Sequence, residues 1–240
     1  MMKKRILAHA LGALVILSGC SSMSNTTKGS LIGAGSGVAV GGLIGGLIGN
    51  NAGGVAIGAA VGGAVGTGAG YLIGKKMDKA KAAAEAVEGA EVEEVTDANG
   101  LEAVKVTFDS GILFATGKST LYSSAQSSLS DFAANVLIPY SDIDVAIQGY
   151  TDNQGWSNST AEESKQKNID LSLQRAQAVS TYLIKQGVPT SQIKSIEGLG
   201  EENPVADNST AAGQAENRRV EIYLYASAEM IEAAQNGTLQ

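Results

Sequence analysis

Two side chains in the C-terminal half of the sequence, Asp152 and Arg175, could together bind a charged ligand. Apolar residues alternate over positions 143–147, which predicts a strand that ends at Gly149. Thr151 and Asp152 then lie on the loop after the strand, a common position for binding groups. The sequence therefore places a carboxylate at a strand end.

The guanidinium belongs to a segment with the pattern of a helix. Asn168, Leu171 and Arg175 are spaced by three and four residues, which places them on one helical face. An apolar stripe predicts a helix over residues 168–186, with Asn168 as its N-cap and Gly187 at its end. In this arrangement the strand end faces a helix start.

Such a set of groups could bind a ligand that carries both charges. A carboxylate, a guanidinium and the free N–H groups of a helix N-terminus suit a zwitterion with an ammonium and a carboxylate. The alternative is a structural ion pair between Asp152 and Arg175, because such pairs are common in folded proteins. The local residues leave both interpretations open.

The N-terminus has the organisation of a secretory signal peptide. Basic residues precede an apolar run, and residues 1–19 end in Leu-Ser-Gly before Cys20, the only cysteine. Leu-Ser-Gly-Cys resembles a bacterial lipobox. This resemblance implies that Cys20 becomes the lipidated first residue, with palmitate among its acyl groups, and that residues 20–28 form a short linker. The alternative is an uncleaved N-terminal anchor.

Charge and composition exclude several classes of protein. The formal net charge is −7, and it becomes −10 when the three basic residues of the signal are removed. A chain this acidic is a poor nucleic-acid binder. The single histidine, His9, lies in the signal, so catalysis by Ser-His-Asp or Cys-His groups and His-ligated zinc are excluded. We therefore expect a binding protein rather than an enzyme, without metal or cofactor.

A glycine ladder occupies residues 29–74. Glycine recurs at every fourth position, the register shifts once at Gly53-Gly54, and no charged residue interrupts the run. This small-xxx-small pattern predicts a membrane-associated hairpin of two closely packed helices, each long enough to cross a bilayer. A flexible glycine-rich linker is the alternative. The Ala, Lys and Glu-rich residues 75–92 predict a polar helical spacer.

The remaining chain predicts an α/β fold. A hairpin with an Asn-Gly turn, a helix over 121–136, the strand and helix above, a strand near 193–199, a short helix over 211–217 and a last strand over 219–224 follow in order. Residues 93–226 should therefore form a βαβαβ(α)β sandwich. Residues 227–240 are expected to be a C-terminal tail.

Seven motifs in this order resemble the OmpA-like peptidoglycan-binding domain: Phe108-Asp109 with Phe114, Gly149-Tyr150-Thr151-Asp152, Asn168-x-x-Leu171-Ser172-x-x-Arg175-Ala176, Gly187-Val188, Gly198-Leu199-Gly200-Glu201, Asn203-Pro204 and Asn217-Arg218-Arg219-Val220-Glu221. With the lipobox and the ladder, which resembles the glycine-zipper segments of bacterial envelope proteins, the whole chain resembles OmpA-family lipoproteins of Gram-negative outer membranes.

The resemblance implies a non-catalytic domain that binds the diaminopimelate of peptidoglycan stem peptides. Asp152 would bind the ammonium and Arg175 the carboxylate, and Asn168 would lie beside the ligand. Thr151 and Leu171 belong to the same motifs. Arg219, or its neighbour Arg218, would form the edge of the site.

Two departures from the family pattern are visible. The loop between the acid and the base is about eight residues longer than the family pattern and contains the insert 153–167, which forms either a lid or a bulge into solvent. Ala115 and Gly117 stand where the family often has Asp and Asn, so a ligand contact could be missing there.

Together these features predict a lipoprotein that tethers the outer membrane to the cell wall. Its partners would be outer-membrane lipid and peptidoglycan, with the C-terminal domain in the periplasm. The alternative hypothesis is an oligomeric or secretion-linked envelope assembly, built by the glycine ladder as a homo-oligomer, that uses the C-terminal domain only for localisation on the wall.

Overall fold

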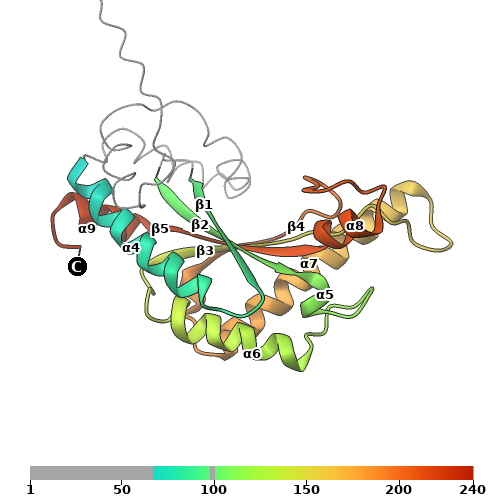
Figure 1. The fold of residues 1–240 in the computed structure, drawn as a ribbon, viewed down its shortest axis with the longest axis horizontal. Coiled ribbons are helices and arrows are strands. Elements are labelled where there is room, and N and C mark those ends of the chain that lie inside the picture. Colours follow the sequence, from blue (N-terminus) through green and yellow to red (C-terminus); the bar gives the residue numbers. More distant parts are fainter. Residues whose placement is uncertain (1–66, 98–100, 240) are drawn as a thin grey trace, which may run out of the picture.

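The computed structural model describes residues 67–97 and 101–239, which contain a five-stranded sheet covered by helices (Figure 1). The strand order is β1-β2-β5-β3-β4; β3 and β4 are parallel and the other neighbours are antiparallel. The strands are β1 Ala90–Thr96, β2 Glu102–Asp109, β3 Ile143–Gly149, β4 Ile193–Gly198 and β5 Arg219–Ala226. The predicted α/β class and the order of its strands are confirmed.

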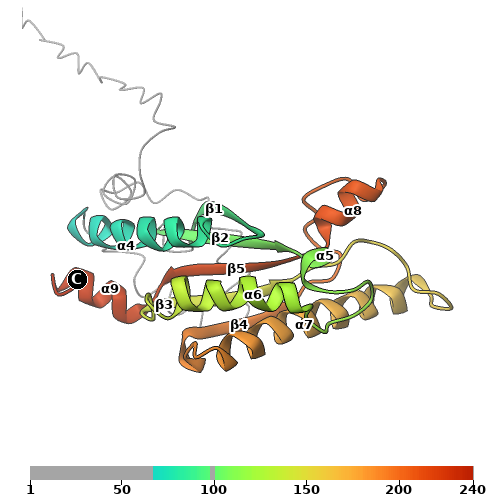
Figure 2. The ribbon, with the colours of Figure 1, turned by 60° about the horizontal axis from the view of Figure 1, so that its bottom comes forward.

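The helices occupy both expected and unexpected positions in the chain. They are α4 Thr67–Glu85, α5 Ser110–Leu113, α6 Ser123–Phe132 with the π-helical turn η1 Ala133–Leu137, α7 Ala161–Lys185, the 3-10 turn η2 Thr190–Gln192, α8 Ala211–Asn217 and α9 Ala228–Gln235. Figure 2 shows α6 and α7 together on one side of the sheet and α8 beyond the ends of the strands. The helix predicted over 121–136 corresponds to α6 and η1, and α8 has the predicted bounds.

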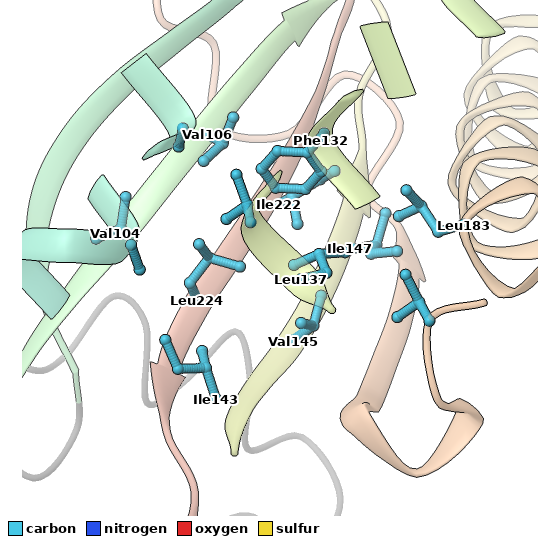
Figure 3. Close-up of a cluster of buried hydrophobic side chains, with 14 of the residues drawn as sticks. Val104, Val106, Phe132, Leu137, Ile143, Val145, Ile147, Leu183, Ile222 and Leu224 are labelled. Atoms are coloured by element: carbon cyan, nitrogen blue, oxygen red, sulfur yellow. The ribbon is translucent and has the colours of Figure 1, made fainter. Parts of the chain in front are cut away.

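One hydrophobic core lies between the sheet and the helices (Figure 3). Alternate residues of β2 and β5, such as Val106 and Ile222, point into it, and Leu183 of α7 closes it. Phe108 and Phe132 meet edge to face, with ring centroids 5.8 Å apart. Full burial of such side chains stabilises the fold by roughly 1.5–3 kcal/mol each. Residues of β3 and α7 belong to this core, which holds the two elements in fixed positions.

The two ends of the described region differ from expectation. α4 buries a stripe at intervals of three and four residues and packs on β1, β2 and η1, whereas a polar spacer was expected over 75–92. The stripe consists of Ala69, Ile73, Met77, Ala80 and Ala84. Within the expected tail, α9 packs against α4 through Met230 and Ile231. Small alanines allow this close contact, and Lys76 forms an ion pair with Asp142.

Most of the glycine ladder lies outside the described residues, as do the signal peptide, Cys20 and the expected Asn-Gly turn at 98–100. The last turns of the ladder, from Thr67 onward, form the start of α4. Of the helices in the described ranges, none is both long and apolar enough to cross a bilayer.

Candidate functional site

A pocket of about 450 Å³ lies at the end of β3, and five of the predicted site residues line it. They are Thr151, Asp152, Asn168, Leu171 and Arg175. One wall comes from the loop after β2 and the opposite wall from the loop that precedes α7; Figure 2 shows both at the same end of the molecule. The structure therefore brings the strand-end acid and the helix base to one cavity.

Close backbone contact fixes α7 against the end of β3. A Cβ atom at Gly149 would lie 2.1 Å from the Ser172 carbonyl oxygen, so only glycine fits there. Gly198, at the end of the neighbouring β4, approaches the same helix as closely. The Ser172 hydroxyl also accepts a hydrogen bond from the Gly200 N–H at 2.9 Å. These contacts fix the position of α7 against the sheet. Arg175, one turn further along the helix, therefore lies beside the loop that carries Asp152.

Asp152 is nearly buried and is paired with Arg218 rather than with Arg175. Its Oδ2 accepts from Arg218 Nη1 at 2.5 Å, and its Oδ1 accepts from the Gln154 backbone N–H at 3.1 Å. Arg218 also lines the pocket. The structural ion pair between Asp152 and Arg175, which the sequence left open, does not form.

Arg175 is only 2% exposed, yet its guanidinium is incompletely bonded. Its Nε donates to the Lys118 carbonyl oxygen at 3.0 Å, and the group lies 5.4 Å from the Phe114 ring centroid. Its Nη1 has no hydrogen-bond partner. Burial, followed by the nearby Arg218 charge, lowers the pKa of Arg175, while Asp152 opposes this shift. The guanidinium stays protonated near neutral pH and lacks a full set of acceptors.

Two further buried polar atoms in the same pocket lack a partner, the hydroxyl oxygens of Ser110 and Thr151. Buried donors and acceptors are nearly always bonded in folded proteins, so such groups require an explanation. Three of them around one cavity indicate a polar ligand. A shallower hollow of about 520 Å³ between α6 and α7 has no such atom among its described lining residues.

Asn168 is not the N-cap of the helix, which corrects the prediction. α7 begins earlier, at Ala161, because Thr160 and Glu163 form a reciprocal capping box. Asn168 lies inside the helix; its Nδ2 donates to the Asp152 and Gln154 carbonyl oxygens at 3.4 and 3.3 Å. It therefore anchors the loop after β3, and free helix N–H groups are not available at this position. The second half of the insert 153–167 consists of the first turns of α7.

Arg219 lies outside the pocket, and its predicted place at the site edge is taken by Arg218. The two side chains point to opposite sides of the extended chain, because side chains alternate along a strand. Arg219 stacks over the Tyr150 ring at 3.8 Å, and its Nε donates to Glu221 Oε1 at 2.7 Å. It is thus part of a buried network behind the site.

Some lining residues could not be identified by sequence spacing. Ser110 directly follows β2 as the first residue of α5, and nothing in its local sequence distinguishes it from the other serines of the chain. Trp156 lies in the insert and donates from Nε1 to Asn168 Oδ1 at 2.7 Å. In the described ranges, no three His, Cys, Asp or Glu side chains are grouped so that they could hold a metal ion.

A mixed sheet with its main helices on one face and a charged pocket at a strand end define a small ligand-binding α/β domain. Residues 113–218 match the OmpA family model, and residues 2–78 match the model of the YMGG-like Gly-zipper. The C-terminal domain is therefore similar to the OmpA family, and the segment before it is similar to a Gly-zipper.

Individual proteins show a similarity over the same region. The chain is 43% identical to Probable lipoprotein YiaD of Escherichia coli K12 over 119 residues, which is 50% of this chain and 47% of that protein. It is 48% identical to Peptidoglycan-binding protein ArfA of Mycobacterium tuberculosis H37Rv over 81 residues, 34% of this chain and 22% of that protein. The matched segments thus span less than half of these relatives.

Among solved structures, a MotB-like protein from Desulfovibrio vulgaris has the same fold. It superposes with a TM-score of 0.53 at 24% identity, covering 64% of this chain and 93% of that chain. At this identity the likeness shows the fold alone. The fold of the described region is therefore that of OmpA-like and MotB-like domains.

Proposed function

We propose that the chain is a non-catalytic lipoprotein that tethers the outer membrane to the cell wall. In this proposal the pocket binds the diaminopimelate of peptidoglycan stem peptides, and acyl groups on Cys20 anchor the chain in the outer membrane. The lipobox-like sequence and the match to a lipoprotein support the anchor. Two or more acyl chains are needed for stable anchoring.

The observation that carries the proposal is the unpartnered Nη1 of the buried Arg175. A carboxylate placed there would accept the free N–H and offset the burial of the guanidinium. The pocket holds two guanidinium groups, Arg175 and Arg218, against one carboxylate, Asp152, so it favours a ligand with an additional negative group. The Thr151 and Ser110 hydroxyls supply further hydrogen bonds.

The ligand ammonium would bind at Asp152. Its Oδ1 accepts only the Gln154 N–H, which leaves lone pairs free for a second donor. Diaminopimelate carries an ammonium and a carboxylate on its free carbon centre, which matches this acid and base. A lysine at the same position of a stem peptide lacks the carboxylate and would leave Arg175 Nη1 without a partner.

Sedimentation with purified sacculi tests the proposal. The full chain in detergent should pellet with diaminopimelate-type sacculi and fail to pellet with lysine-type sacculi. Arg175→Ala and Asp152→Asn should each reduce the pelleted fraction about tenfold or more, since each loses a charge-assisted hydrogen bond. Lys194→Ala, which removes a half-exposed cation outside the pocket, is the charge control. Equal pelleting of all variants would refute the proposal.

The anchor is tested separately by Cys20→Ala. This variant lacks the acylated side chain and should no longer incorporate labelled palmitate, while its pelleting with sacculi is retained; membrane fractionation alone would not decide, because the glycine ladder is also predicted to associate with the membrane. If labelled palmitate were still incorporated, the proposed lipid anchor at Cys20 would be wrong and the wall-binding proposal would be unaffected.

A further inference from the structure

The outer wall of the pocket is built by the first half of the insert. Gly155, Trp156 and Ser157 line the cavity opposite Phe114 and Thr116. Trp156 is the only tryptophan of the chain, and 36% of its surface is exposed. The ring of Trp156 therefore places apolar surface in the same pocket as the charged side chains, where a ligand would contact both.

The indole of Trp156 is held in place by hydrogen bonds on its polar edge and backbone. Its Nε1 donates to Asn168 Oδ1 at 2.7 Å, and its backbone N–H donates to the Ser164 hydroxyl at 3.0 Å. Asn168 in turn binds the carbonyl oxygens of Asp152 and Gln154. Because its N–H is turned to α7, the indole can meet the cavity only with apolar ring atoms.

The cavity has room for more than a charged end group. A volume of about 450 Å³ lies within the usual range of sites that enclose a whole small ligand. The charged groups Asp152, Arg175 and Arg218 can hold the zwitterionic end. Beyond them the lining offers Trp156 and Leu171, which suit a hydrocarbon segment rather than another charge.

We propose that Trp156 is a specificity-determining residue whose ring packs on the methylene chain of the bound diamino acid. The inference rests on the proposed function, because it takes the zwitterionic end of the ligand to be held at Asp152 and Arg175. Two features of the pocket then determine which ligand binds. The charges at the end of β3 select a zwitterionic end, and Trp156 in the insert selects a ligand with a methylene chain. The first half of the insert is accordingly a wall of the site rather than a bulge into solvent.

Two soluble probes separate the roles of charge and chain. meso-Diaminopimelate carries two zwitterionic centres joined by three methylene groups, whereas D-alanine carries one zwitterionic centre and one methyl group. D-norleucine, with one zwitterionic centre and an unbranched hydrocarbon chain, is therefore measured beside them and should respond to Trp156→Ala as diaminopimelate does. Binding of each to the full chain in detergent is measured by calorimetry. Trp156→Ala should weaken diaminopimelate binding roughly four- to fifteenfold, the equivalent of one or two methylene groups returned to water, and D-alanine binding less than about twofold.

The single tryptophan supplies a second readout. In the unmodified chain, diaminopimelate should shift the emission of Trp156 and protect it from acrylamide quenching, and D-alanine should protect it much less. Trp156→Phe keeps an aromatic ring and loses the N–H; it should retain the preference for diaminopimelate. Tyr71→Ala, at an exposed aromatic on α4, is the matched control. Circular-dichroism melts verify that each variant is folded.

Four results would overturn the inference. Trp156→Ala could weaken both probes equally, which would assign the residue a merely structural role, or it could weaken neither. Trp156→Phe could lose the preference completely, which would assign the effect to the hydrogen bond with Asn168. If Arg175→Ala left binding of both probes unchanged, the proposed function itself would fail, and the inference with it.

Discussion

Two buried arginines, Arg175 of α7 and Arg219 of β5, differ in how fully they are bonded. Arg219 donates to Glu221, to the Asn217 carbonyl oxygen at 3.2 Å and to the Asn203 carbonyl oxygen at 3.1 Å. Arg175 has one backbone acceptor and a free Nη1. Burial alone therefore does not distinguish a structural arginine from a ligand-binding one.

The surroundings of Arg219 are closed by further hydrogen bonds. Glu221 Oε2 accepts from the Tyr223 hydroxyl at 2.6 Å. Burial, and then the Glu221 charge, raise the pKa of both Tyr150 and Tyr223, so both hydroxyls remain protonated donors. A network with all of its members bonded rigidifies a core. The Arg175 side, in contrast, keeps unused hydrogen-bonding capacity, which is what a binding site requires.

The largest expected effect is the loss of stability in Arg219→Ala. The substitution leaves the buried Glu221 with only the more distant cation of Lys105, at 4.0 Å, which should lower the free energy of unfolding by about 3 kcal/mol. Urea denaturation measures it. Adding Glu221→Gln to Arg219→Ala removes the uncompensated charge and should recover part of the loss. A loss below that of an ordinary surface substitution would show that the network is not structural.

Ligand binding should produce the next largest effect, on the Arg175 side. If the free Nη1 marks the site, meso-diaminopimelate at ten times its dissociation constant should stabilise the folded chain by about 1.4 kcal/mol. Thermal melts of the full chain with and without the ligand measure the change. Arg175→Met should show no shift at the same concentration. A shift that persisted in Arg175→Met would place the ligand elsewhere.

Arg175→Met by itself should change stability little. The substitution removes a guanidinium whose burial is only partly compensated, and it leaves only the Lys118 carbonyl oxygen without its donor, so the free energy of unfolding should stay within about 1 kcal/mol of the unmodified chain. Urea denaturation next to Arg219→Ala gives the direct comparison. If Arg175→Met and Arg219→Ala lowered the free energy of unfolding equally, Arg175 would be as structural as Arg219.

Local patterns were sufficient to predict most of the fold and five of the residues that line the pocket. Alternating strands, the apolar stripe of α7 and the order of the motifs depend on neighbouring residues, and the structure confirms the strands that they predict. Asp152, Asn168 and Arg175 line one cavity as the strand-end and helix-face arguments required. Their role in binding remains a prediction.

The errors arose where two local signals competed or where contacts are distant. Thr160 and Glu163 carry a capping-box signature, which was obscured by the polar composition of the insert. The choice between Arg218 and Arg219 depends on which of them starts the pairing of β5, a tertiary property. The buried stripe of α4 consists mostly of alanines, and α9 is short, so their packing on each other leaves a weak hydrophobic pattern in the sequence.

The smallest expected effect concerns Asp144 of β3. Its partner, Lys194, offsets the burial of this carboxylate only in part. Burial raises the pKa of Asp144 to about 6, although Lys194 at 3.5 Å opposes the shift. The folded chain therefore holds this proton more tightly than the unfolded chain, and the stability that it contributes is lost as the pH rises from about 4 to 6. Asp144→Asn keeps an uncharged side chain at every pH.

Asp144→Asn should consequently raise the melting temperature above pH 6 and have almost no effect near pH 4. The gain should be less than about 1 kcal/mol, because the pair with Lys194 lies in partly exposed surroundings and is lost in the variant. Melting curves between pH 4 and 7.5 measure it, with the exposed Asp170→Asn as control. A change in melting temperature of equal size at all pH values would mean that packing, rather than the charge of Asp144, explains the difference. The contrast between well-bonded and poorly bonded charges would then apply only to the two arginines.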